Sequence, residues 1–424
     1  MAELYQMQEE RERVVLVGVA TSEQDDTEES IAELAELVRT AGADAAGTVL
    51  QNREAPHPGT YLGKGKIEEL KELVVSLNAT GIVCDDELSP AQMKNLEMAL
   101  DCKVMDRTMV ILDIFAQHAS TKEGKIQVEL AQLKYRSSRL IGMRNSLSRL
   151  GGGIGTRGPG EKKLEMDRRL IKDRIAQLNR ELADVIKSRE VLRAARNRSP
   201  VPVAAIVGYT NAGKSTLLNY LTDAGVLEED KLFATLDPTT RNLELSGGQN
   251  ILLTDTVGFV RKLPHHLIDA FRSTLEEAKY ADIILHVADA SNPDCDRQLH
   301  VVYETLRELG VTDKTMITVF NKQDLLRAAI EAGEMLPESR KDLKADEVVK
   351  VSAKTGEGIT ELLEVLERVL RERKVLVEHI FPYSEIGRIQ QIRKYGQLLE
   401  EEYRDDGTYI KAYLPKELYM KLFG

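Results

Sequence analysis

Glycines, one lysine and one serine are spaced along Gly208–Ser215, GYTNAGKS, as in a phosphate-binding loop. Such glycines let backbone amides close around a β-phosphate, while the lysine supplies charge to the β and γ oxygens and the serine hydroxyl binds Mg²⁺. The apolar run AAIV precedes the loop and the helical pattern LLNYL follows it, which argues against a chance glycine-rich turn. The nucleotide phosphates are therefore predicted to contact Gly208, Tyr209, Thr210, Asn211, Ala212, Gly213, Lys214, Ser215 and Thr216.

A second phosphate motif, DTVG, ends the apolar run ILLTDT. The carboxylate of Asp255 can hold Mg²⁺ through a water molecule, and the Gly258 amide can sense the γ-phosphate. We interpret Asp255, Thr256, Val257, Gly258 and Phe259 as the second switch. In Ras-like switches the residue after this motif is a glutamine that orients the attacking water. Phe259 has no hydrogen-bonding side-chain group, so we expect it to pack and another group to place the water.

Two further motifs, NKQD and SAK, each follow an apolar strand pattern. A carboxylate at Asp324 can accept hydrogen bonds from N1–H and the 2-amino group of guanine, and adenine offers no such pair of donors. Lys322 is expected to lie along the base, and Asn321 to brace the phosphate loop. The predicted guanine contacts are Asn321, Lys322, Asp324, Ser352, Ala353 and Lys354. Four motifs in this order predict binding of GTP and its hydrolysis to GDP and phosphate.

Between the first two motifs lies FATLDPTTR, where a first switch would offer a threonine to Mg²⁺ and the γ-phosphate. Thr235, Thr239 and Thr240 compete for this role, and we favour Thr235 because turn chemistry around Pro238 explains the other two. We expect this switch to comprise Phe233, Ala234, Thr235, Leu236 and Thr239. The predicted Mg²⁺ ligands are Ser215, Thr235 and, through water, Asp255; the predicted catalytic groups are Lys214, Thr235 and Gly258.

Strand patterns alternating with helical patterns predict an α/β multidomain protein. Residues 1–120 predict an N-terminal α/β domain, and residues 121–198 a long antiparallel helical hairpin with a glycine-rich tip, GGGIGTRGPG. Residues 199–373 predict a doubly wound P-loop GTPase domain. Residues 374–424 predict a small α+β C-terminal domain with a turn at DDG between two strands.

The hairpin is basic although the whole chain carries a formal charge of −11. Residues 122–198 hold 20 lysines and arginines against 9 acidic residues, so the rest of the chain carries an excess of 22 negative charges. Such a block is either a nucleic-acid footprint or a solvated hairpin balanced by acidic domains, and charge alone does not decide between them. Arg149 and Arg157 flank the tip and are our candidates for RNA contact.

Nothing in the composition indicates a membrane or a secreted protein. No stretch approaches the ~20 apolar residues that span a bilayer, and the charged start MAELYQMQEERER lacks the apolar core of a signal peptide. Cys84, Cys102 and Cys295 lie far apart, without a disulfide framework or zinc-ligand spacing. We therefore expect a cytoplasmic protein that acts as a monomer.

The loop with Asn211 ahead of Ala212-Gly213-Lys214 resembles that of GTPases related to Era, Obg and the tRNA-modification GTPase. The rest of the chain resembles the HflX family of ribosome-associated GTPases more closely. The similarity covers nearly the whole chain, and only residues 375–424 are weakly distinctive. It is carried by YLGKGKIEEL, VMDRT, LDIFAQHASTKEGKIQVELAQLKY, LSRLGGGIGTRGPGE and FATLDPTTR.

This resemblance implies a GTPase that binds the large ribosomal subunit and its rRNA and that splits or rescues ribosomes under stress. GTP, GDP and Mg²⁺ are the expected ligands. Because Phe259 cannot place the water, either the partner orders the switches, which the resemblance favours, or Asn211 helps to hold K⁺ beside the phosphates, as in the related tRNA-modification GTPase. The alternative is a non-ribosomal regulatory switch whose hairpin binds a protein partner. A third function, tRNA modification, would require a cofactor site or a reactive cysteine, and neither Cys84 nor Cys102 has such a setting.

Three other features have an ordinary structural explanation. The family is associated with adenine-nucleotide binding in its N-terminal domain, but LGKGK, Leu62–Lys66, lacks the phosphate-loop spacing and better fits a tight turn before a helix. His265 and His266 fit the start of a helix better than a base or metal ligand. Arg241 is a candidate finger for hydrolysis, although a solvated loop residue is the simpler interpretation.

Overall fold

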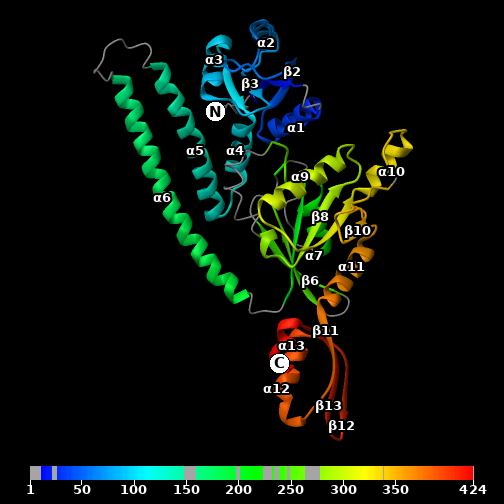
Figure 1. Cartoon of the computed structure of the whole chain (residues 1–424). Helices are drawn as coiled ribbons and strands as arrows, with labels where there is room; N and C mark the ends of the chain where they lie inside the picture. Colours follow the sequence, from blue (N-terminus) through cyan, green and yellow to red (C-terminus); the bar gives the residue numbers. More distant parts are fainter. Residues whose placement is uncertain are drawn as a thin grey trace, which may run out of the picture. The chain divides into compact units, whose positions relative to one another are not determined.

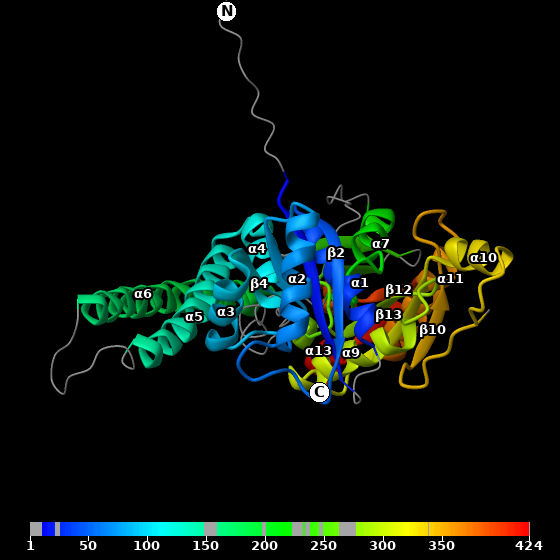
Figure 2. The ribbon, with the colours of Figure 1, turned by 90° about the horizontal axis from the view of Figure 1, so that it is seen from above.

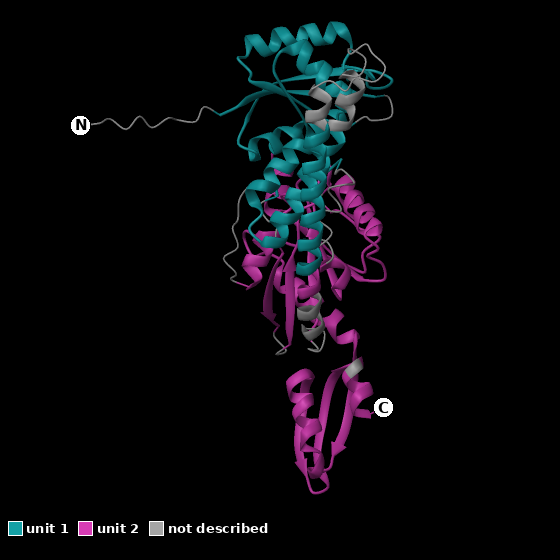
Figure 3. Ribbon diagram, turned by 90° about the vertical axis from the view of Figure 1, so that its left-hand side faces the viewer, with its two compact units in different colours: residues 1–185, 231–233, 261–271 teal, residues 186–230, 234–260, 272–424 magenta. Residues whose placement is uncertain are grey.

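The structure is a computed structural model that describes residues 11–21, 26–147, 159–196, 201–222, 232–233, 238–245, 249–262, 277–337 and 339–423. It separates into two compact units, drawn in teal and magenta in Figure 3. Unit 1 comprises residues 1–185, 231–233 and 261–271, and unit 2 comprises residues 186–230, 234–260 and 272–424. Several predictions fall outside the described residues, namely those on Arg149, Arg157, Ala234, Thr235, Leu236, His265 and His266.

The N-terminal part of unit 1 is an α/β domain, as predicted. Its elements are β1 (Arg13–Ala20), α1 (Thr27–Thr40), β2 (Asp44–Asn52), α2 (Lys64–Ser76), β3 (Gly81–Cys84), α3 (Pro90–Leu100), β4 (Lys103–Asp106) and α4 (Arg107–His118). The four strands are parallel in the order β2-β1-β3-β4. The middle strands β1 and β3 are almost wholly buried, as is typical of parallel sheets. Val17 and Ile82 share a core with Leu70 of α2 and Leu96 of α3, so these two helices cover the sheet.

Two long helices, α5 (Lys122–Leu147) and α6 (Pro159–Arg196), form the predicted antiparallel hairpin (Figures 1 and 2). Leu178 of α6 is 1% exposed and packs with Ile126 and Leu130 of α5, which confirms the apolar seam. Helix α6 begins inside the segment predicted as the tip, because a proline is tolerated in a first helical turn. Neither these helices nor any other helix in the described part of the chain combines the length and apolar character needed to cross a membrane.

Unit 2 contains a six-stranded sheet in the order β10-β9-β8-β5-β7-β6. Its strands are β5 (Val203–Gly208), β6 (Thr239–Glu244), β7 (Asn250–Asp255), β8 (Ile283–Asp289), β9 (Thr315–Asn321) and β10 (Glu347–Lys350). Its described helices are α7 (Lys214–Thr222), α9 (Cys295–Glu308), α10 (Gln323–Glu331) and α11 (Ile359–Glu372). Strand β5 pairs in parallel with both β7 and β8, so the sheet winds away from it in two directions. This is the predicted doubly wound fold, and ligands bind at such a switch point.

The end of unit 2 is the predicted small α+β domain. It comprises β11 (Lys374–Phe381), the short helix η1 (Tyr383–Glu385), α12 (Ile386–Tyr395), β12 (Gln397–Arg404), β13 (Gly407–Pro415) and α13 (Lys416–Phe423). The strands form an antiparallel sheet in the order β11-β13-β12, with the predicted hairpin between β12 and β13. Ile410 and Leu414 of β13 pack with Ile389 of α12 and Leu418 of α13, a helix that the sequence did not predict.

Candidate nucleotide site

The four predicted motifs lie at the carboxyl ends of strands in the unit 2 sheet. The phosphate loop begins at Gly208, where β5 ends, and the second motif begins at Asp255, where β7 ends. Asn321 ends β9, and Ser352 follows β10. Because β5, β7, β8, β9 and β10 are parallel, these ends share one edge of the sheet. Segments far apart in the sequence are therefore brought to one site.

Glycine is required at two positions of the phosphate loop. Gly213 has a φ of +89°, and a β-carbon there would lie 2.3 Å from Nδ2 of Asn321. Gly208 has a φ of +156°, and a β-carbon there would lie 2.1 Å from the carbonyl oxygen of Val287. Side chains at these positions would force the loop away from its neighbours. The glycine spacing seen in the sequence is therefore a requirement of this backbone path.

Lys214 is buried at the start of α7, and its Nζ donates to the carbonyl oxygen of Tyr209 at 2.8 Å. Burial lowers the pKa of Lys214 to about 8, with Asp255 opposing that shift and Lys322 reinforcing it. A buried ammonium with few compensating partners interacts strongly with an incoming anion, because little water screens it. This arrangement suits the predicted contact with the β- and γ-phosphates.

Ser215 and Asp255 form the described part of the predicted Mg²⁺ site. The hydroxyl of Ser215 donates to Oδ2 of Asp255 at 2.8 Å, and Asp255 is fully buried at the end of β7. A hydroxyl and a carboxylate are oxygen donors of the kind that Mg²⁺ prefers, and their separation allows both to share one ion directly or through water. The residues present therefore fit the ion.

Asn321 joins the phosphate loop to the SAK segment. Its Nδ2 donates to the carbonyl oxygen of Ala212 at 2.9 Å, and its Oδ1 accepts from the amide of Ala353 at 2.9 Å. Both bonds are buried, so both amide atoms of one side chain are satisfied inside the protein. Asn321 thus braces the phosphate loop, as the sequence predicted.

Among the described residues, Ser352 holds the side chain of Asp324, which is predicted to select guanine. The hydroxyl of Ser352 donates to Oδ1 of Asp324 at 2.7 Å. This bond leaves Oδ2 for the base and fixes the plane of the carboxylate. Ser352 is fully buried whereas Asp324 is half-buried and Lys354 is exposed. The backbone amide of Ser352 itself donates to the carbonyl oxygen of Glu357 at 3.0 Å, so Ser352 acts on the guanine site through its side chain.

Asp289 is a site residue that the sequence did not single out. It ends β8, and its Oδ2 lies 2.8 Å from Nζ of Lys322. Lys322 is the residue before the first turn of α10, with a left-handed φ of +62°, and its side chain is engaged in this ion pair. The position of Asp289 at the end of the strand DIILHVAD, between the two motif-bearing strands β5 and β9, was the available signal.

The second switch is tied to the phosphate loop by backbone hydrogen bonds. The amide of Thr210 donates to the carbonyl oxygen of Phe259 at 2.8 Å. The amide of Phe259 in turn donates to the carbonyl oxygen of Gly208 at 3.1 Å. Thr256 donates its hydroxyl to the carbonyl oxygen of Ile206 at 2.8 Å. The Phe259 side chain is 2% exposed, as expected of a packing residue. This side chain supplies no group that could orient water.

The first switch differs from its prediction where it is described. Thr239 and Thr240 lie in β6, antiparallel to β7, and the Thr240 hydroxyl lies 3.0 Å from that of Thr254. Arg241 is exposed in the same strand and donates to the carbonyl oxygen of Thr240. These residues form a strand because they pair with β7 along the whole of β6, where the sequence indicated a loop. Phe233 belongs to unit 1, where its ring packs edge-on against Phe115 with 4.7 Å between centroids.

Arg261 and Lys262, which follow the second switch, belong to unit 1 and form ion pairs with its acidic side chains. Lys262 lies between Asp85 and Asp86, with 2.7 Å from its Nζ to Oδ1 of Asp86. Asp85 also pairs with Arg107, Nη1 to Oδ1 at 2.7 Å. Burial alone would raise the pKa of Asp85, but Arg107 and Lys262 outweigh it and lower that pKa. Arg261 reaches Asp26 at 3.4 Å.

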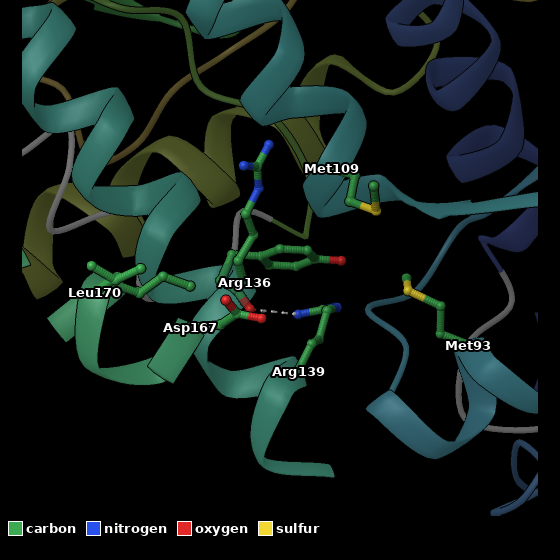
Figure 4. A pocket seen from close by; sticks show the side chains of 8 residues that line it. Met93, Met109, Arg136, Arg139, Asp167 and Leu170 are labelled. Atoms are coloured by element: carbon green, nitrogen blue, oxygen red, sulfur yellow. Dashed lines mark hydrogen bonds between the residues drawn. The ribbon is translucent and has the colours of Figure 1, made fainter. Parts of the chain in front are cut away.

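The LGKGK segment forms no phosphate loop. Gly63 precedes α2 and donates its amide to Oε1 of Gln51 at 2.9 Å, and Lys66 pairs with Glu69 at 2.7 Å. The segment is thus the turn before a helix. A cavity of about 530 Å³ elsewhere in unit 1 is lined by Met93 of α3, Met109 of α4, and other residues of α5 and α6 (Figure 4). No residue of LGKGK lines it.

Three family models match consecutive parts of the chain. Residues 28–116 match the model described as GTP-binding GTPase N-terminal, and residues 118–196 match GTP-binding GTPase Middle Region. Residues 203–322 match the model described as 50S ribosome-binding GTPase. Together these models cover the N-terminal domain, the hairpin and most of the nucleotide-binding sheet.

Similar proteins extend over the full length. A GTPase HflX of Lacrimispora saccharolytica is 68% identical over 422 residues, which is 100% of this chain and 98% of the relative. The GTPase HflX of Escherichia coli K12 is 42% identical and covers 94% of this chain and 92% of the relative. A solved GTP-binding protein of Sulfolobus solfataricus in complex with GDP is 25% identical with a TM-score of 0.44, covering 84% of this chain and 98% of that chain. The motifs, their geometry and these full-length relatives together place the chain in the HflX family of GTPases, which bind and hydrolyse GTP.

Proposed function

We propose that this GTPase associates with the large ribosomal subunit through its rRNA, and that it splits or rescues ribosomes under stress. The observation that carries the proposal is the basic helical hairpin within an acidic chain, because RNA contact is dominated by phosphate neutralisation. The match of residues 203–322 to a model described as 50S ribosome-binding GTPase supports the same partner.

The described part of the hairpin presents lysines for such contacts. Lys134 on α5 and Lys172 and Lys187 on α6 are exposed, whereas Arg174 is engaged with Glu129 at 2.8 Å. Exposed lysines along two helices can follow an RNA backbone without reading its sequence. Arg149 and Arg157 at the tip remain candidates for the closest contacts.

Within the GTPase reaction, the residues of this chain bind and orient the nucleotide. Asp324 and Asn321 select and seat the guanine end, and Lys214 with the amides of the phosphate loop neutralises the β- and γ-phosphates. Ser215 and Asp255, with Thr235 as the proposed first-switch ligand, would hold Mg²⁺. A bound Mg²⁺ would supply positive charge that offsets the negative charge developing on the phosphates.

Because Phe259 cannot orient water, we propose slow hydrolysis by the isolated chain and stimulation by large subunits, which would order the switches. K⁺ held beside Asn211 is a second proposed source of positive charge near the β–γ bridge, where an arginine finger is worth ~10³–10⁵ in rate in other GTPases. Arg241 is a weaker candidate, since it lies exposed on β6.

The competing proposal is a non-ribosomal switch whose hairpin binds a protein. The two differ in their response to salt, because each RNA phosphate contact contributes about 0.7–0.9 to the slope of log affinity against log salt. Docking of a protein on the helices would show no such steep slope. The acidic remainder of the chain makes the hairpin the expected site of any nucleic-acid contact.

Co-sedimentation with purified large subunits, with and without a non-hydrolysable GTP analogue, tests the proposal. Lys172→Gln with Lys187→Gln should weaken binding and lower the salt slope by about 1.4–1.8. Lys279→Gln with Lys341→Gln, which changes the net charge equally at exposed lysines of unit 2, should leave that slope unchanged. Equal effects of both pairs, or no sedimentation with subunits, would favour the protein-partner alternative.

Turnover measured with and without subunits, in K⁺ and in Na⁺, separates the proposed routes of hydrolysis. Phe259→Leu should lose little activity, because the side chain only packs. Asn211→Ala should remove any dependence on K⁺. A fast basal rate that subunits leave unchanged would refute the proposal that the partner completes the site.

A further inference from the structure

The hydroxyl of Thr210 is the feature of the site that the preceding chemistry leaves unused. Thr210 is 6% exposed, and its Oγ1 has no hydrogen-bond partner among the residues that the structure describes. A buried hydroxyl without a partner is unfavourable for folding, so its presence calls for a reason. Because Thr210 lies in the phosphate loop, its hydroxyl is placed to take part in GTP hydrolysis.

Thr210 is held firmly against the second switch. Its amide donates to the carbonyl oxygen of Phe259 at 2.8 Å. A β-carbon placed on Gly258 would lie 2.7 Å from Cγ2 of Thr210 and 2.9 Å from Nζ of Lys214. The Thr210 methyl group and the Lys214 ammonium therefore both lie beside the glycine whose amide is expected to contact the γ-phosphate, and the Thr210 hydroxyl is carried on the same β-carbon as that methyl.

Other hydroxyls and cations near this point are already engaged. Thr256 donates to the carbonyl oxygen of Ile206, and Ser215 donates to Asp255. Arg241 is exposed on β6 and bonded to a neighbouring carbonyl oxygen. Among the buried hydroxyls in the described part of the site, Thr210 is thus the one without a hydrogen-bond partner.

We propose that Thr210 is a catalytic residue that takes over water placement from the glutamine that this chain lacks. A glutamine amide performs this task with one acceptor and one donor, and a hydroxyl carries both on a single atom. The Thr210 hydroxyl accepts a hydrogen bond from the attacking water and donates one to an oxygen of the γ-phosphoryl group. Both bonds form only when GTP is bound, which explains the orphaned hydroxyl.

The step balances without a proton leaving Thr210. The water oxygen forms the new bond to the γ-phosphorus, and the bond from that phosphorus to the β-phosphate oxygen breaks, with its electron pair going to GDP. One proton of the water passes to the phosphate product. Thr210 fixes the direction of attack, which is a positioning effect on a group that it touches directly.

Single-turnover hydrolysis, GDP affinity and thermal unfolding of three variants test the proposal. Thr210→Val keeps the shape and removes the hydroxyl, so hydrolysis should slow by roughly 10²-fold, the loss typical of one aligned hydrogen bond. Its GDP affinity should be unchanged, and its Tm should be equal or higher because an unpaired buried hydroxyl is gone. Thr210→Ser should retain most of the wild-type rate.

Thr318→Val is the matched control, because this buried hydroxyl on β9 already has a partner, Oδ2 of Asp342 at 2.7 Å. It should lower Tm and leave the single-turnover rate unchanged. Wild-type hydrolysis by Thr210→Val would overturn the proposal. So would equal slowing by Thr210→Val and Thr210→Ser, or a fall in GDP affinity and Tm on Thr210→Val, since either result assigns Thr210 a structural role.

Discussion

Replacing Asp324 by asparagine probes the guanine end of the site, and the structure dictates which way the new amide faces. The Ser352 hydroxyl donates to Oδ1 of Asp324 at 2.7 Å. In Asp324→Asn this bond keeps the amide oxygen on Ser352, so the NH₂ group points to the base. That group then faces the N1–H and 2-amino donors of guanine, and two sets of donors oppose one another.

The expected loss follows from the hydrogen bonds that are exchanged. A hydrogen bond to a charged group contributes about 1.5–3 kcal/mol, and a donor left without an acceptor costs about 1–3 kcal/mol. Asp324 is half-buried, so water relieves part of both effects, and we expect a total near 2–4 kcal/mol. At about 1.4 kcal/mol for each factor of ten, GTP and GDP affinity should fall roughly 30- to 700-fold.

Calorimetric titration of each protein with GDP, ADP and xanthosine diphosphate measures this preference. The xanthine base carries a carbonyl where guanine carries its 2-amino group, so it should bind Asp324→Asn better than the wild type. Adding Ser352→Ala frees the asparagine amide to rotate, and the double variant should recover part of the guanine affinity. Unchanged guanine preference in the single variant would refute the assignment of Asp324 to the base.

The remaining predictions concern the phosphate loop, its lysine and the core of unit 1. Gly213→Ala should lower GDP affinity at least about tenfold in a thermal-shift titration, because the added methyl would lie 2.3 Å from Nδ2 of Asn321. Gly310→Ala is the control, because Gly310 also has a positive φ but has open surroundings. This control should cost about 1 kcal/mol of stability and leave GDP affinity unchanged. Burial lowers the pKa of Lys214 to about 8 from 10.5, so the unfolded chain holds its proton longer and the free energy of unfolding without nucleotide should rise with pH between those values, as urea titrations would measure. Phosphates favour the charged lysine, so GTP affinity should fall above about pH 8, and a Lys214→Gln variant that kept this dependence would refute the assignment. Arg107→Met should destabilise unit 1 by about 3–5 kcal/mol in chemical denaturation, because Asp85 is 1% exposed and would lose a buried partner. Arg404→Met is the control, because Arg404 pairs with Glu402 on the surface. It should lower the free energy of unfolding by less than about 1 kcal/mol.

Much of the site was predictable because its motifs are local. The spacing of Gly208, Gly213, Lys214 and Ser215 within one loop reflects the backbone path that closes around a phosphate, and that path depends on neighbours in sequence. Apolar runs that end at Asp255 and Asn321 likewise mark strand ends without reference to the rest of the chain. The hairpin seam followed from helical periodicity alone.

Other features were not predictable, because they arise between segments far apart in the sequence. The strand β6 exists only through its pairing with β7, so its residues were interpreted as a loop. The ion pair of Asp289 with Lys322 depends on β8 lying beside β9. The contacts of Phe233 with Phe115 and of Lys262 with Asp86 likewise join residues more than a hundred positions apart.

The sequence by itself determined the class of protein, the order of its domains and the residues of its nucleotide motifs, since each depends on periodicity or spacing along the chain. Only the tertiary structure decided how those residues are held: Ser352 on Asp324, Asn321 across two loops, and Thr210 buried against Gly258 with its hydroxyl unpaired. The physical reason is that hydrogen-bond partners and burial are set by which strands and loops become neighbours, and that neighbourhood is a property of the folded sheet.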